Sequence, residues 1–168
     1  NMNTHDLTNV NKITTSTSTI NIGQSNTITG TGSVFVGASN TGGGGGVSII
    51  YGSTNNTSGS TNGQSIVYGN NNSDSNTSGG SFIFGFGNTN GTGARNVLIG
   101  RNLTVPNGVN EAFSMGFGMT NSTSNSLLVG GTNHANIRAG STICDLGTTT
   151  NRFKDLHISG SVVGSVNT

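Results

Sequence analysis

The stretch Ser65-Ile-Val-Tyr-Gly69 decides the fold of this chain, because the same phrase returns at a near-constant step. Each copy has a small residue, then three mostly apolar residues, then a glycine. The glycines of the clear copies are Gly23, Gly37, Gly52, Gly69, Gly85, Gly100, Gly116 and Gly130. Successive glycines are 14, 15, 17, 16, 15, 16 and 14 residues apart, and a degraded copy ends at Gly140. A short unit copied at a fixed step predicts a solenoid, here a rod of eight or nine coils that is about 40 Å long at roughly 4.8 Å per coil.

Both faces of each phrase are apolar. Because alternate residues of a strand point to opposite sides, Ile66 and Tyr68 share one face and Val67 takes the other. A coil of this length cannot enclose two separate cores, so one face must be covered by another chain. We expect the outer pair to form the core of the coil and the middle residue to face a neighbouring chain. The predicted interface residues in the repeats are Phe35, Ile50, Val67, Ile83, Leu98 and Leu128.

The glycine that closes each phrase predicts a turn. Glycine adopts left-handed and other positive-φ conformations without a side-chain penalty, so the chain can reverse there into a second, more polar strand such as 25–30. Longer steps in the central coils predict outward loops at 53–64, 70–80 and 101–111.

Composition excludes several classes of protein. Charged residues are only 7% of the chain and the formal net charge is +1, so no basic surface is available for nucleic acid. No apolar run approaches the roughly 18 residues of a membrane span, so we expect no membrane insertion. Asn, Ser and Thr fill the stretches between the phrases, which is typical of an extracellular or virion-borne surface. The single cysteine, Cys144, is expected to be a small buried side chain.

Catalytic and metal-binding groups are scarce. The chain has five carboxylates, and Asp74 and Glu111 are the pair considered for a glycosidase that forms across a chain interface. If three chains met on a threefold axis, each would contribute one copy of His134 or His157, and the three copies could bind a metal ion. An ordinary exposed histidine is the favoured interpretation of both. We therefore expect no enzyme activity, no catalytic residues, no metal site and no cofactor.

The repeats resemble a known family. Phrases of the form Asn/Ser-x-Val-x-Ile-Gly at a step near 14 residues, spanning 19–140, resemble the head domain of trimeric autotransporter adhesins. That resemblance implies a left-handed parallel β-roll assembled as an intimate homotrimer. This chain differs in its longer coils, its aromatic residues and the absence of an Ala-rich second strand.

A second resemblance lies in the stretch from Cys144 to Gly160. Its elements Leu146-Gly147, Asn151-Arg-Phe153, Asp155-Leu156 and Ile158-Ser-Gly160 resemble a segment found near the ends of phage tail fibres, tailspikes and algal-virus surface proteins. In those proteins the segment commonly precedes an intramolecular chaperone that trimerises the fibre and is then cleaved away. We expect Phe153 and Leu156 to join the trimer interface.

These observations define one set of expectations. Residues 1–18 are a cap or lead-in, 19–140 the repeat β-roll and 141–168 a neck or trimerisation segment. The expected protein is a homotrimeric structural fibre or spike on a virion surface or tail, which contacts other virion proteins and supports attachment to a host surface glycan or protein receptor. A bacterial trimeric adhesin head is the alternative, and a polysaccharide-depolymerising tailspike is the lesser one.

Overall fold

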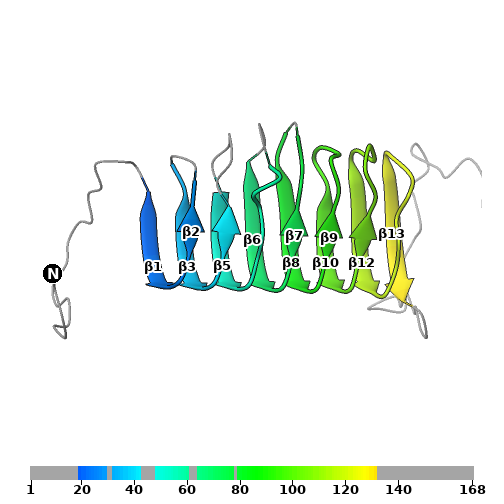
Figure 1. Ribbon diagram of the computed structural model, residues 1–168. Coiled ribbons are helices and arrows are strands. Elements are labelled where there is room, and N and C mark those ends of the chain that lie inside the picture. The colour runs from blue at the N-terminus through cyan, green and yellow to red at the C-terminus, as the bar shows by residue number, and fades with distance from the viewer. Residues whose placement is uncertain (1–18, 30–31, 43–47, 61–63, 78, 132–168) are drawn as a thin grey trace, which may run out of the picture. The chain divides into compact units, whose positions relative to one another are not determined.

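A computed structural model of the chain describes residues 19–29, 32–42, 48–60, 64–77 and 79–131. The chain divides into two units, Asn1–Ala135 and Asn136–Thr168, and every described residue belongs to the first. The repeated phrases form one eight-stranded, all-parallel sheet (Figure 1). In spatial order its strands are β1 (Ile20–Gln24), β3 (Val34–Ala38), β5 (Ser48–Ser53), β6 (Ser65–Asn70), β8 (Ser81–Phe86), β10 (Val97–Arg101), β12 (Ala112–Phe117) and β13 (Ser126–Gly131).

The other side of each coil is built from much shorter strands. They form a pair, β2 (Thr27–Ile28) with β4 (Thr41–Gly42), and a sheet of β7 (Ser73–Asp74), β9 (Thr89–Asn90) and β11 (Thr104–Val105). Isolated parallel bridges from Asn56 to Thr41 and to Ser73 connect these two groups. The described residues form no helix. The predicted all-β parallel solenoid is confirmed. Most of its coils pair one long strand with one short strand.

The register of the long sheet follows the sequence repeat. Ile66 pairs with Ile49 on one side and with Phe82 on the other, and Gly69 pairs with Gly52 and Gly85. Differences in step length are therefore absorbed outside the long strands, in the loops and the short-strand side.

The interior and exterior faces of the phrase are the reverse of those predicted. Val67 is 1% exposed, whereas its neighbours Ile66 and Tyr68 are 45% and 46% exposed. The physical reason is the narrow coil: Ser65 lies on the same face as Val67, and β5, β6 and β8 each place one serine and one branched side chain in the interior. The prediction that the middle residues face another chain is thus wrong for Phe35, Ile50, Val67, Ile83 and Leu98, which are all 0–1% exposed inside their own coil.

The remaining predicted interface residues have different outcomes. Leu128 of β13 points to the same side as these core residues and is half-buried. Phe153 and Leu156 lie outside the described residues.

The closing glycine has the predicted positive φ but lies within the long strand, and the turn follows it. Gly69 has φ +131°, and a Cβ built on it would lie 1.8 Å from the carbonyl oxygen of Gly85 in the next coil. Both the backbone conformation and the close approach between coils therefore require glycine. Two residues later, Asn71 adopts the left-handed region with φ 59° and turns the chain into the short strand.

The character of the core changes along the rod. In the central coils it holds many buried polar side chains, among them Ser65, Asp74 and Asn90. Further along the chain it gains the completely buried Leu103 and Val105, although Asn96 and Ser114 are buried there as well.

Candidate assembly surface

The long sheet presents two outward columns of apolar side chains, which together we call the apolar face. One column holds the residues three positions before each phrase glycine: Ile20, Val34, Ile49, Ile66, Phe82, Val97, Phe113 and Leu127. The other holds the residues directly before each glycine: Ile22, Val36, Tyr51, Tyr68, Phe84, Ile99, Met115 and Val129. All sixteen side chains are exposed or half-buried, and they lie on every strand of the sheet. Figure 1 shows these eight strands side by side.

Aromatic rings are stacked at the centre of the apolar face. The rings of Tyr51 and Tyr68 lie 4.9 Å apart with 4° between their planes, and those of Tyr68 and Phe84 lie 5.0 Å apart with 12° between theirs. This spacing follows from the separation of neighbouring strands, so the rings form a rigid, pre-arranged surface.

Such a face is costly in water. Monomeric soluble proteins rarely expose a contiguous apolar patch of more than a few hundred Å², and larger ones mark interaction sites. Here the patch spans eight strands, and at roughly 4.8 Å per spacing the first and last strands lie about 34 Å apart. No described residue on its sixteen positions is charged, so the apolar face has the composition of a contact surface.

Inside the coils, asparagines form a ladder that the sequence analysis missed. The ladder consists of Asn26, Asn40, Asn55, Asn72 and Asn88. From Asn40 on, each donates its Nδ2 to the Oδ1 of the preceding asparagine and to the glycine carbonyl of the following coil. Leu103 ends the ladder by donating its backbone N–H to Asn88 Oδ1. The signal was present in the sequence as Gly-x-x-Asn, since each asparagine stands three residues after a phrase glycine.

A second buried polar network surrounds Asp74. Its carboxylate accepts hydrogen bonds from Ser65 Oγ at 2.5 Å and from Asn90 Nδ2 at 2.7 Å, and also from the backbone N–H of Asn76. Asn90 also donates to Ser81 Oγ. Asp74 is 1% exposed, so this carboxylate holds coils together and is not available to a substrate.

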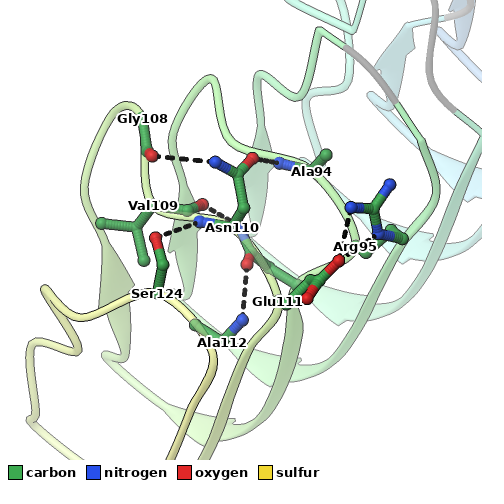
Figure 2. Close-up of polar contacts among 9 residues, drawn as sticks. Ala94, Arg95, Gly108, Val109, Asn110, Glu111, Ala112 and Ser124 are labelled. Carbon is green, nitrogen blue, oxygen red and sulfur yellow. Dashed lines mark hydrogen bonds and ion pairs between the residues drawn. The ribbon is translucent and has the colours of Figure 1, made fainter.

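Glu111, the other carboxylate considered for catalysis, lies at an exposed turn. It accepts hydrogen bonds from Arg95 in the preceding coil (Figure 2), and both side chains are largely exposed. Beside this ion pair, Asn110 Oδ1 accepts from the backbone N–H of Ala94 at 2.8 Å, and the N–H of Asn110 donates to Ser124 Oγ. The cluster in Figure 2 thus ties three successive turns together. The structure does not bring Asp74 and Glu111 into a shared site within the chain.

The two candidate metal ligands, His134 and His157, lie outside the described residues, as does Cys144. Within the described ranges no group of three or more His, Cys, Asp or Glu side chains is arranged to hold a metal ion. The same part of the chain has no helix long and apolar enough to cross a membrane.

Comparisons with protein-family models, with curated proteins and with solved structures found no match to this chain. The class of protein is therefore the one that the fold itself defines, a parallel β-solenoid with a continuous apolar face.

Proposed function

We propose that this chain is the rod segment of a homotrimeric surface fibre, in which three solenoids meet through their apolar faces. The observation that carries the proposal is the sixteen-residue apolar face with its central aromatic stack. Burying this surface would stabilise an assembly by roughly 25 cal/mol for each Å² of apolar area removed from water.

We keep the prediction of an oligomer but assign its interface to different residues. The residues that meet across the chains are now the outward pairs such as Ile66 and Tyr68, because the middle residue Val67 is buried within its own coil. Closed cyclic symmetry lets a flat, uniform face on each of three rods meet the others around one axis. The number three comes from the resemblance to trimeric adhesin heads and viral fibres.

The location proposed is a virion surface or tail. It is supported by the resemblance of the 144–160 stretch to the terminal segments of phage fibres and tailspikes, and by a surface of Asn, Ser and Thr with very few charges. In that setting the rod projects from the particle and supports attachment to a host glycan or protein. Three equivalent copies of a weak contact would give avidity.

The role we propose is structural rather than hydrolytic. A glycosidase needs two carboxylates flanking the scissile bond, and the burial of Asp74 removes the Asp74–Glu111 pair from consideration. The bacterial adhesin head is the second candidate, and the repeat phrase supports it equally well. A membrane-anchor domain encoded downstream would favour the adhesin, whereas a chaperone domain would favour the fibre.

A charge-insertion experiment tests the assembly. The double variant Tyr68→Lys and Phe84→Lys places two cations on the apolar face of each chain, so the trimer should dissociate into folded monomers. The matched control, Thr89→Lys and Thr120→Lys, adds the same charge at exposed positions on the short-strand side and should keep the trimer. Light scattering gives the masses. Equal masses for the two double variants would contradict the proposed interface.

A further inference from the structure

Three side chains form a cation–aromatic cluster at one edge of the rod. Phe86, Arg101 and Phe117 follow the phrase glycines of β8, β10 and β12 and occupy the same register in three adjacent strands. The Arg101 Cζ lies 5.5 Å from the ring centroid of Phe86 and 5.6 Å from that of Phe117. The guanidinium is therefore held between two rings, an arrangement that restricts its motion.

The fold does not require aromatic residues here. At the equivalent position of the other strands the residues are small or polar: Gln24, Ala38, Ser53, Asn70 and Gly131. Phe86 and Phe117 remain 46% and 41% exposed, so they contribute little to the core. They lie at the ends of their strands, where the chain turns toward the short-strand side, and outside the two columns of the apolar face.

The charge of Arg101 has no ion-pair partner among the described residues. Of the two arginines in the described ranges, Arg95 forms an ion pair with Glu111, whereas no described carboxylate lies within ion-pairing distance of Arg101. A guanidinium presents a planar fork of N–H donors that matches a carboxylate in a bidentate manner. Since the rings already restrict the side chain, less freedom is lost when an anion binds.

A polar donor lies next to the cluster. Asn70 of β6 occupies the register position that pairs with Phe86 of β8. Its Oδ1 accepts hydrogen bonds from the backbone N–H and the Oγ of Ser53. That arrangement directs Oδ1 toward Ser53 and leaves the Nδ2 of Asn70 with no hydrogen-bond partner among the described residues. A ligand that lies across β6, β8 and β10 at this register would contact the amide of Asn70, then the ring of Phe86, then the guanidinium of Arg101.

We propose that Phe86, Arg101 and Phe117, with Asn70 beside them, bind the carboxylate of an acidic saccharide. The carboxylate pairs with the Arg101 guanidinium, the rings cover the apolar faces of the sugar, and Asn70 donates to a hydroxyl oxygen. The proposal rests on the proposed attachment role and names the ligand class for it. Three copies in a trimer would raise a weak affinity by avidity.

The test measures binding to the intact chain by calorimetry or ligand-observed NMR. The probes are sialyllactose with lactose as its neutral counterpart, oligogalacturonate with its methyl ester, and poly-glutamate as a carboxylate polymer without sugar. We expect at least one of the acidic saccharides to bind more tightly than its neutral counterpart, and the preferred acid identifies the source. Arg101→Gln should weaken binding about tenfold or more, as expected for a lost charge-assisted hydrogen bond. Arg101→Lys should restore only part of it.

Arg95→Gln is the matched control, since it removes one arginine charge at another exposed turn and should leave binding unchanged. Equal binding of acid and neutral probes, equal loss in both glutamine variants, or poly-glutamate binding as tight as that of the saccharide would each overturn the proposal. Light scattering on the same samples separates the two proposals. A trimer that binds no acidic saccharide refutes the site alone, whereas a monomer that binds one refutes the assembly alone.

Discussion

Asn55 joins three successive coils from the inside: its Nδ2 donates to Asn40 Oδ1 at 3.0 Å and to the carbonyl oxygen of Gly69 at 2.7 Å. Its own Oδ1 accepts from the backbone N–H and the Nδ2 of Asn72. One buried amide therefore satisfies polar groups in the coil before it and in the coil after it. Repetition of this unit connects successive turns beside the column of buried apolar side chains that includes Ile50 and Val67.

Replacing Asn55 by alanine should destabilise the rod strongly. The change leaves the Gly69 carbonyl and the Asn72 donors without their buried partner, and an unsatisfied buried group costs about 1–3 kcal/mol. Asn56→Ala is the control, because Asn56 is exposed and, among the described residues, its side chain forms hydrogen bonds only with Ser58. Urea denaturation gives both free energies of unfolding. Similar values for the two variants would show that the ladder contributes little.

Gly69→Ala should prevent normal stacking of the coils. The added Cβ would lie 1.8 Å from the Gly85 carbonyl oxygen, and the φ of +131° is itself unfavourable for alanine. Gly108→Ala measures the free-energy cost of a positive φ without a steric clash, since Gly108 has φ +79° but no atom within 4 Å of a Cβ built on it. We expect a loss of about 1 kcal/mol for the control and loss of the folded state for Gly69→Ala. Circular dichroism with thermal melting distinguishes these outcomes.

The two faces of the phrase should respond differently to a charge. Val67→Asp places a carboxylate in the closed interior and should unfold the chain, because an unpaired buried charge is very costly. Ile66→Asp on the adjacent, exposed position should keep the β-sheet signal and weaken assembly instead. If Val67→Asp stayed folded while Ile66→Asp unfolded, the orientation of the strands would be wrong.

Replacing Asp74 and replacing Glu111, the two carboxylates among the described residues, should change the stability of the chain by different amounts. Asp74→Ala removes the acceptor for Ser65 and Asn90 and should cost roughly 2–4 kcal/mol. Glu111→Ala breaks an exposed ion pair with Arg95, which is worth about 0–1 kcal/mol. Thermal denaturation of the two variants side by side measures the difference, and an equal loss would contradict the structural role of Asp74.

The sequence predicted the solenoid, its register and the positive φ of the phrase glycines, because a fixed step and a phrase of alternating residues determine the strand pairing. It did not predict which face was interior. Both faces of Ser65–Gly69 are apolar, and only the small size of Ser65 indicated the narrow side. The asparagine ladder was readable as Gly-x-x-Asn.

The cation–aromatic cluster could not be predicted from the phrase. Phe86, Arg101 and Phe117 are far apart in the sequence, and only the register of β8, β10 and β12 brings them together. The loops from each short strand to the next long strand differ in length from coil to coil, so their contacts could not be read from one shared pattern.

Sedimentation equilibrium of the intact, untagged chain tests the central claim most directly. A homotrimer joined through the apolar face predicts a species of three times the 16.9 kDa chain mass that persists at low micromolar concentration. A folded species with the mass of a single chain, at every concentration measured, would contradict the account.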